Sequence, residues 1–142
     1  MGHFMAREYV TIREEVQGDE TVWKETSVGR TRLKSAPAKV SRIRNGQYRI
    51  MGAAWGTPIQ RVEVQIDGGA WQPATLAQGS NAFAWNFWQL DWNDPAAGEH
   101  DVSSRAVDKN GNVQPAPTDP IITNKHTYWE SNGQITRHLR IV

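Results

Sequence analysis

Polar and apolar residues alternate over several short stretches of this chain. In the clearest of them, residues 61–66, three apolar side chains fall on one face and three polar side chains on the other. A period of two is typical of a half-buried β-strand. The next residues, Asp67-Gly68-Gly69, favour a turn because glycine adopts positive φ without steric cost. Since the chain then returns through Trp71 to Leu76, the pattern predicts a β-hairpin over residues 61–76.

Other stretches with strand-like composition are separated by turn residues such as Asn45-Gly46. They are Tyr9–Arg13, Thr21–Glu25, Lys39–Ile43, Gln47–Trp55, Ala82–Trp92, His100–Val107 and Ile135–Val142. No stretch shows a sustained 3.6-residue apolar period with capping residues, so no helix is expected. The pattern therefore predicts an all-β fold, an antiparallel β-sandwich of about seven strands with an N-terminal extension.

Two stretches exceed what a minimal sandwich needs. Residues 1–37 form the N-terminal extension, and residues 114–133 form a long connection that contains Pro115, Pro117 and Pro120. Connections of that length in a compact domain are usually functional or packed against something. Both stretches therefore indicate that the domain lies beside a partner.

The chain is 142 residues long and has no cysteine. The length suits one domain, and the lack of cysteine excludes a disulfide, a thiolate zinc site and a cysteine nucleophile. No apolar run approaches the roughly 20 residues of a membrane helix, so no membrane partner is expected. Residues Met1 to Met5 lack the features of a signal peptide, as would any fragment cut from the end of a longer protein.

Basic residues are unevenly distributed along the chain. Eight of the 16 Lys and Arg residues lie between Arg30 and Arg61, and no acidic residue interrupts that stretch. Such an asymmetry can mark a nucleic-acid surface. The net charge is only +1, which favours a solvated strand face or an interdomain surface. No nucleic-acid partner is therefore expected.

Seven tryptophans are an unusually large number for a domain of this size. A regular strand over residues 82–92 would carry large apolar side chains on both faces: Phe83, Trp85 and Phe87 on one, and Trp88, Leu90 and Trp92 on the other. Because a sandwich strand needs only one apolar face, either a β-bulge near Asn86 turns both groups inward or one face meets a partner. We expect most tryptophans in the core and one or two at an interface. The candidates for the core or a dimer interface are Trp55, Trp71, Trp85, Trp88 and Trp92.

Metal and catalytic motifs are weak. Asp108, Asn110 and Asn112 place oxygen ligands at alternate positions, as in a calcium loop, but Val113 and Asp119 stand where that loop needs Gly and Glu. A plain Asn-Gly turn is the preferred interpretation. The four histidines are scattered without the spacing of a zinc site, and no phosphate loop or Ser-His-Asp grouping is evident. No metal site and no catalytic residue are therefore expected.

A set of short motifs resembles one known family. They are Gly52-Ala53-Ala54-Trp55-Gly56, Asp67-Gly68-Gly69-Ala70-Trp71, Ala84-Trp85, Phe87-Trp88, Gly98-Glu99-His100, Arg105-Ala106-Val107-Asp108 and Gly111-Asn112-Val113-Gln114-Pro115. In their order and spacing they resemble the C-terminal dimerisation domain of molybdenum-cofactor, sulfite-oxidase-like oxidoreductases. The resemblance covers most of residues 28–142. It implies an immunoglobulin-like sandwich of the E-set type that brings two subunits together about a two-fold axis.

The resemblance also implies a parent enzyme that transfers an oxygen atom to or from a small substrate such as sulfite, on a molybdenum-pterin cofactor. Residues 1–37 look like the end of the preceding catalytic domain and the joining segment, which leaves residues 38–142 as the dimerisation domain. This chain alone is expected to hold no cofactor and to have no activity, because it lacks the cysteine that coordinates molybdenum. The expected partners are a second copy of the chain and the catalytic domain of the same polypeptide.

Four basic residues are candidates for contacts with that catalytic domain. The family's C-terminal strand carries an arginine that can line an anionic substrate pocket, and the best match is Arg137. A guanidinium suits this role because it binds an oxyanion through two hydrogen bonds. The alternative is an ordinary strand arginine. Arg30, Arg32 and Lys34 resemble the segment that joins the two domains.

A second functional interpretation comes from a different class of protein. An immunoglobulin-like accessory module can bind carbohydrate through coplanar, exposed tryptophans, whereas a dimer interface buries them. The sequence leaves the compartment open: a periplasmic location is the expectation for bacterial relatives, and a cytoplasmic location also fits.

Overall fold

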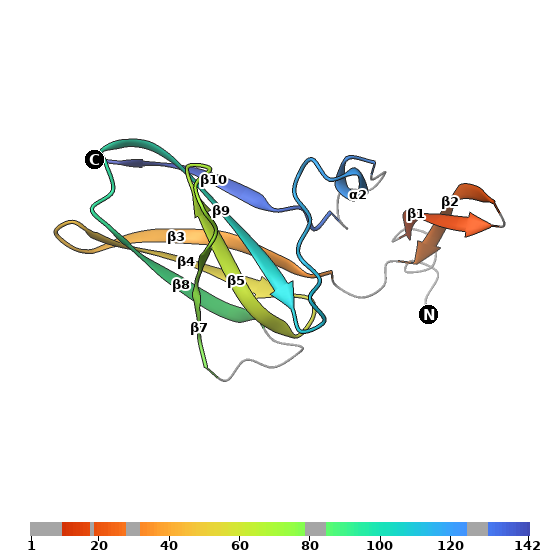
Figure 1. Ribbon diagram of the computed structural model, residues 1–142, viewed down its shortest axis with the longest axis horizontal. Coiled ribbons are helices and arrows are strands. Elements are labelled where there is room, and N and C mark those ends of the chain that lie inside the picture. The colour runs from red at the N-terminus through yellow and green to blue at the C-terminus, as the bar shows by residue number, and fades with distance from the viewer. Residues whose placement is uncertain (1–9, 18, 28–31, 79–84, 125–130) are drawn as a thin grey trace.

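The computed structural model describes residues 10–17, 19–27, 32–78, 85–124 and 131–142, and its side chains are described at residue 19 and from residue 32 onward. Two four-stranded antiparallel sheets pack face to face (Figure 1). One has the strand order β3-β4-β8-β7 and the other β10-β9-β5-β6. Their bounds are β3 Lys34–Arg44, β4 Gln47–Trp55, β5 Ile59–Ile66, β6 Gln72–Pro73, β7 Thr75–Leu76, β8 Asn86–Asn93, β9 Gly98–Asp108 and β10 Ile135–Ile141. The predicted all-β sandwich is confirmed.

The N-terminal extension contains a further hairpin. Strand β1 (Val10–Gln17) pairs antiparallel with β2 (Glu20–Ser27), and among the described strands each pairs with the other alone. Tyr9, the expected start of the first strand, lies outside the described residues. Strand β3 begins at Lys34, upstream of the boundary expected at residue 38, and its first residues pair with β4.

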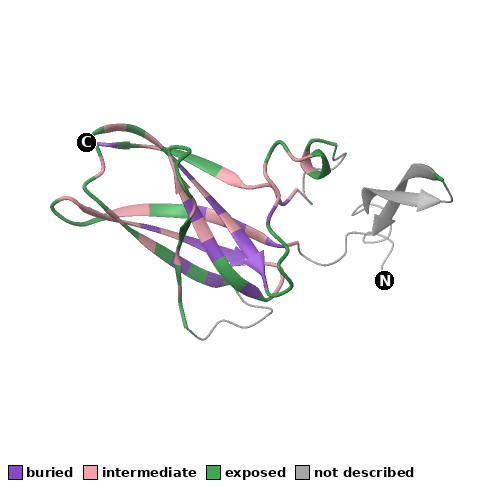
Figure 2. Ribbon diagram, in the orientation of Figure 1, coloured by how far each residue is buried: buried purple, intermediate pink, exposed green. Residues whose placement is uncertain are grey.

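The core lies between the two sheets, where Figure 2 shows the buried residues. Its members are mostly the alternate apolar residues of the central strands: Leu33, Ile50, Ala54, Ile59, Val62, Val64, Trp88, Val102 and Ala106. The 61–66 alternation places Val62 and Val64 inward and fully buried, as predicted. Burying a side chain of that size is worth about 1.5–3 kcal/mol.

Hydrogen bonds cross the core between the two sheets. The Trp88 indole donates from Nε1 to Ser35 Oγ at 3.0 Å, and Ser35 Oγ also bonds Ser104 Oγ at 2.8 Å. Trp88 packs this closely because its partner on β4 is Gly52, where an added Cβ would lie 2.3 Å from the indole and 2.3 Å from the Ala36 carbonyl. A glycine is therefore required at this position.

The predicted hairpin over residues 61–76 is right for its first part and wrong for its second. Glu63 and Val64 pair with Pro73 and Gln72. Thr75–Leu76 instead joins the opposite sheet, where it pairs with β8. The chain leaves β5 after Ala74, whose N–H donates to Val62 O at 2.9 Å, and Leu76 then packs against the core.

The expectation of no helix was also wrong at one place in the long connection. Helix α2 (Pro120–Thr123) is a single turn. Asp119 caps it by accepting a hydrogen bond from the Ile121 N–H at 3.0 Å, and Pro120 occupies the first turn, where its missing N–H costs nothing. Four residues are too few to show a helical period in the sequence.

Candidate functional site

The outer face of the β3-β4-β8-β7 sheet carries the most distinctive surface. Because paired residues and their second neighbours along a strand share a face, the registers place the outward side chains in cross-strand rows. We call these residues the outer aromatic face. Its rows are Lys34-Trp55 with Trp85 beside them, then Ala36-Ala53-Phe87, then Lys39-Met51-Gln89 with Thr75, and finally Ser41-Arg49-Asp91.

Two large aromatic side chains on this face are exposed to solvent. Phe87 is 60% exposed and Trp85 is 61% exposed. Trp85 stacks on Trp55 with ring centroids 5.2 Å apart and planes inclined by 21°. Pairing between β4 and β8 is regular from Ala54↔Asn86 to Gln47↔Asn93, so the bulge considered near Asn86 is wrong. The regular strand therefore puts Phe87 outward and Trp88 inward, and Phe83 lies outside the described residues.

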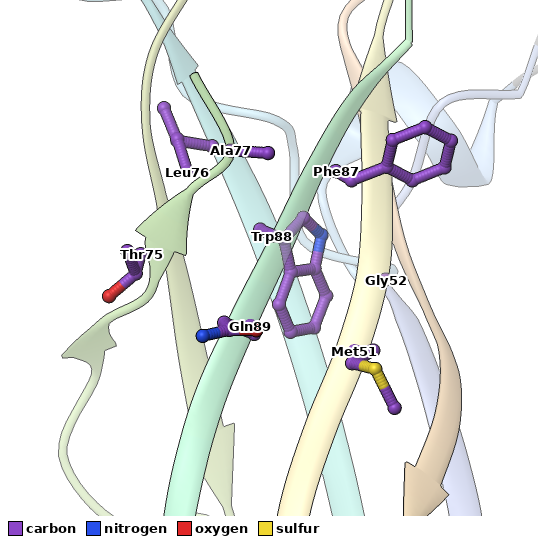
Figure 3. Close-up of a pocket in the computed structure, with 8 residues that line it drawn as sticks. All are labelled: Met51, Gly52, Thr75, Leu76, Ala77, Phe87, Trp88 and Gln89. Atoms are coloured by element: carbon purple, nitrogen blue, oxygen red, sulfur yellow. The ribbon is translucent and has the colours of Figure 1, made fainter.

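A depression of about 370 Å³ continues the apolar row next to Phe87. Figure 3 shows the residues around it, among them Met51 from β4, Thr75 and Leu76 from β7, and Phe87 from β8. It forms where β7 covers only two residues of β8, so the sheet narrows there. The face thus has both a protruding ring and a recess beside it.

At the opposite end of the outer aromatic face the side chains are polar, and Arg49 and Asp91 bond each other. Arg49 donates from Nε to Asp91 Oδ1 at 2.7 Å and from Nη2 to Asp91 Oδ2 at 3.3 Å. The hydrogen bond from Arg49 holds the pKa of the Asp91 carboxyl below its usual value. This row therefore presents no uncompensated charge.

The remaining candidate tryptophans do not belong to this face. Trp88 is 2% exposed, and Trp92 packs against the core, so both face inward. Trp71 lies on the outer side of the other sheet, with the Arg105 guanidinium 4.2 Å above its ring centroid. Of the five candidates only Trp88 and Trp92 therefore face the core, whereas Trp55, Trp71 and Trp85 lie on outer faces, so these five do not follow the expectation that most tryptophans pack in the core.

The outer side of the β10-β9-β5-β6 sheet is polar throughout its centre. The Glu63 carboxylate accepts hydrogen bonds from Arg61 at 2.8 Å and from Arg105 at 2.8 Å. Partial burial opposes ionisation of Glu63, but the two guanidinium groups outweigh it and lower its pKa. Beside them the hydroxyls of Ser103 and Thr136 bond at 2.6 Å. These groups satisfy one another, in contrast to the outer aromatic face.

The basic candidates lie apart from the outer aromatic face or at its end. Arg137 points from the edge strand β10 toward β3 and donates from Nε to Pro37 O at 3.2 Å, which joins the two sheets. Lys34 donates from Nζ to Ser131 O at 3.1 Å. Arg32 is half-buried just before β3, and Arg30 lies outside the described residues.

Sequence reasoning missed the residue that ties the long connection to the sandwich. Gln114 is fully buried. Its Oε1 accepts hydrogen bonds from the N–H groups of Ser35 at 2.8 Å and Ala106 at 3.2 Å, and its Nε2 donates to Ser35 O and Gly133 O. A glutamine next to Pro115 gave no signal of burial, because glutamine is mostly exposed in proteins.

Sequence reasoning also missed the arrangement around His100 at one end of the sandwich. The His100 Nδ1 lies 2.6 Å from Asp67 Oδ2, and its Nε2 lies 2.7 Å from Ala96 O. Because a carboxylate and a carbonyl both accept hydrogen bonds, this arrangement requires a proton on each ring nitrogen. The ring also meets Trp92 of the opposite sheet edge-on at 4.9 Å. The hydrogen bonds to Ala96 and Asp67 raise the pKa of His100.

The Asp108 turn uses its oxygen ligands internally. Asp108 accepts hydrogen bonds from the backbone N–H groups of Asn110 and Asn112 at 2.9 Å each, and from Asn112 Nδ2 at 3.0 Å. Gly111 adopts φ +82°, as the Asn-Gly turn requires. Within the described residues, no three His, Asp or Glu side chains come close enough to hold a metal ion. The same part of the chain has no helix long and apolar enough to cross a membrane.

Comparison with known proteins gives this fold a family. Residues 24–134 match the family described as Mo-co oxidoreductase dimerisation domain. Sulfite oxidase from Gallus gallus is 37% identical over 84 residues, which cover 54% of this chain and 18% of that protein. The sulfane dehydrogenase SoxCD from Paracoccus pantotrophus has a crystal structure that fits with a TM-score of 0.73 at 27% identity, covering 96% of this chain and 36% of that chain.

This chain therefore spans only part of the length of both relatives. The match covers the sandwich from β3 to β9 and the whole of the long connection, and it ends just before β10. The resemblance seen in the sequence motifs is confirmed, and the chain belongs to the Mo-co oxidoreductase dimerisation domain family.

Proposed function

We propose that this chain joins two subunits of a molybdenum-dependent, sulfite-oxidase-like oxidoreductase, and that it also packs against the catalytic domain of its own polypeptide. The observation that carries the proposal is the exposure of Phe87 and Trp85 on one sheet face of a dimerisation-domain sandwich. An aromatic ring buries about 150–250 Å² when it is covered. Covering these two rings with a partner would therefore favour association substantially.

In this proposal the reaction belongs to the catalytic domain of the parent enzyme. A molybdenum-pterin cofactor would there transfer an oxygen atom to or from a small substrate such as sulfite. The present chain does not fit that cofactor, because its sequence has no cysteine to provide the thiolate ligand. Its contribution is therefore architectural.

The end of the sandwich at which the upstream chain enters suits a contact with the catalytic domain. Asn132 Nδ2 donates to Leu33 O at 3.0 Å, and Lys34 bonds the Ser131 carbonyl, so the start of β3 and the end of the long connection hold each other in place. The hairpin β1-β2 precedes this point, and we assign the residues upstream of β3 to the end of the catalytic domain and the joining segment. A rigid junction would fix the orientation of one domain on the other.

Arg137 is the proposed contact with the anionic substrate of the parent enzyme. Its Nε is committed to Pro37 O, and the side chain is exposed at the edge of the sandwich. The two terminal nitrogens of a guanidinium can bind an oxyanion while Nε keeps another partner. Arg32 and Lys34 would support the same interdomain contact from the start of β3.

Tryptophan quenching by acrylamide tests self-association. The difference in quenching between the wild type and Trp85→Phe isolates Trp85. If the chain dimerises through its exposed aromatics, the accessibility of Trp85 falls as the protein concentration rises. A Trp85 that stays equally accessible at every concentration would contradict the proposal and would return weight to a carbohydrate-binding platform.

A further inference from the structure

We infer that the outer aromatic face is the surface on which a second copy of this chain docks, with the Ala36-Ala53-Phe87 row near the two-fold axis. The inference rests on the proposed function and goes further by choosing one of the two outer sheet faces. It also names the residues at the centre and at the rim of the contact.

The two outer faces differ in how far their side chains are already paired. On the β10-β9-β5-β6 sheet, Glu63 is bonded by two arginines, and the Ser103 and Thr136 hydroxyls bond each other. Covering that face would strip water from charged groups, and its Trp71 ring already lies beneath the Arg105 guanidinium, so the apolar gain would be small. On the outer aromatic face the central row is apolar; its Ala53 is already buried, but its Phe87 is 60% exposed, so covering Phe87 is favourable.

The order of the rows suits a contact of a face with itself. The apolar row lies next to the stacked Trp55 and Trp85, whereas Arg49 and Asp91 lie two rows away and neutralise each other. A two-fold axis near the apolar row would put Phe87 of each copy against the partner's apolar row, beside the depression lined by Met51 and Thr75. The paired charges would remain at a hydrated rim, where they cost little.

The lysines of this face lie on the edge strand β3. Lys39 belongs to the row of Met51, and Lys34 bonds the Ser131 carbonyl. Because the one acid of the rows, Asp91, is already bonded by Arg49, a second copy offers no new partner for Lys39. Lys39 therefore belongs at the solvated edge of the contact, not at its centre.

The size of the face limits how tightly two chains can bind. Strands lie about 4.8 Å apart and rise about 3.3 Å per residue, so this sheet covers roughly 500 Å² per copy. A contact of about 1,000 Å² in total is near the lower limit for a specific interface. The chain alone should therefore form a dimer with a dissociation constant in the micromolar range.

Single-cysteine cross-linking locates the contact, since the natural sequence has no cysteine. Gln89 on β8 and Gln65 on β5 offer a matched pair of glutamines on the outer faces of the two sheets. With a short thiol cross-linker, Gln89→Cys should give covalent dimers at a rate that rises with concentration, and Gln65→Cys should give few. Cross-linking through Gln65→Cys but not Gln89→Cys would overturn the choice of face.

A surface substitution separates the choice of face from self-association itself. Phe87→Glu should raise the dissociation constant by at least about tenfold. Ile121→Glu is the matched control, since Ile121 is 54% exposed but lies in α2, and it should leave dimerisation unchanged. A wild type that stays monomeric contradicts the proposed function. A wild-type dimer that Phe87→Glu leaves intact contradicts only the choice of face, and the cysteine pair still distinguishes the two faces if Phe87→Glu fails to fold.

Discussion

The side-chain amide of Gln114 pairs with both backbone groups of Ser35, a residue 79 positions earlier. Its Oε1 accepts from the Ser35 N–H at 2.8 Å, and its Nε2 donates to the Ser35 carbonyl at 3.3 Å. The side chain thus bonds β3 in the way a neighbouring strand would. Because the same amide also bonds Ala106 and Gly133, one residue joins both sheets and the long connection.

Replacing Gln114 should therefore destabilise the sandwich strongly. Gln114→Met keeps the approximate volume but leaves the buried N–H groups of Ser35 and Ala106 without this acceptor, and each such loss costs about 1–3 kcal/mol. We expect the free energy of unfolding in urea to fall by about 3 kcal/mol. The control is Gln65→Met, because Gln65 is partly exposed and bonds only Gly69 O at 2.9 Å. Equal stabilities for the two variants would contradict the role assigned to Gln114.

Neighbouring aromatic residues on β8 should have opposite effects. Trp88→Phe removes the indole hydrogen bond to Ser35 and part of the core volume, so it should lower the free energy of unfolding by about 2 kcal/mol. The affinity of the folded chain for itself should not change. Phe87→Glu should leave unfolding within about 0.5 kcal/mol of the wild type, because its ring is exposed. The measurements are urea unfolding and the dissociation constant of each variant, and a loss of affinity in Trp88→Phe alone would reverse this assignment.

His100 should make stability depend on pH. Its pKa is raised in the folded chain by hydrogen bonds to Ala96 O and Asp67, so its contribution is fully present below its ordinary pKa of 6.5. The contribution is lost as the pH rises through the raised value. Asp67 has a lowered pKa, so its share is lost at acid pH, as the pH falls through that lowered value.

The measurement is the difference in unfolding free energy between the wild type and His100→Gln. That difference should be larger at about pH 5.5 than at about pH 9, because only the charged imidazole can donate to both acceptors. The control is His138→Gln, which removes the exposed hydrogen bond between His138 on β10 and Asp101 on the adjacent strand β9. A difference that does not change with pH would contradict a raised pKa of His100 in the folded chain.

The Asp108 turn should be structural and insensitive to calcium. Asp108→Ala removes three hydrogen bonds from the turn after β9, so it should cost about 2 kcal/mol of unfolding free energy. The pKa of Asp108 is lowered because hydrogen bonds from Asn112 and Asn110 outweigh the effect of its burial, so this stability is lost as the pH falls. Calcium at millimolar concentration should not raise the thermal midpoint of the wild type, and a clear rise would restore the calcium-loop interpretation.

Residue periodicity predicted the sandwich well where strands are long. The alternation over 61–66 and the opposite facing of Phe87 and Trp88 follow from the pleat alone, and both are observed. Thr75–Leu76 could not be placed in this way, because two residues have no period, and their sheet is decided by the bond from Ala74 to Val62 O.

The exposed side of the sheet was harder to predict than its core. The sequence placed aromatic side chains on both faces of one strand, and a bulge could have turned both groups inward. Only the regular pairing of β4 with β8 decides that Trp85 and Phe87 remain outside. The roles of Gln114 and His100 depend on partners between 30 and 80 positions away, namely Ser35 and Asp67, and local composition does not report such contacts.

Sedimentation equilibrium of the full chain tests self-association through the outer aromatic face most directly, with Phe87→Glu run beside the wild type. We expect the average mass of the wild type to rise from one chain toward two as the concentration increases through the micromolar range. The variant should remain near the mass of one chain over the same range. A wild type that stays monomeric throughout, or a variant that dimerises as well as the wild type, would contradict self-association through this face.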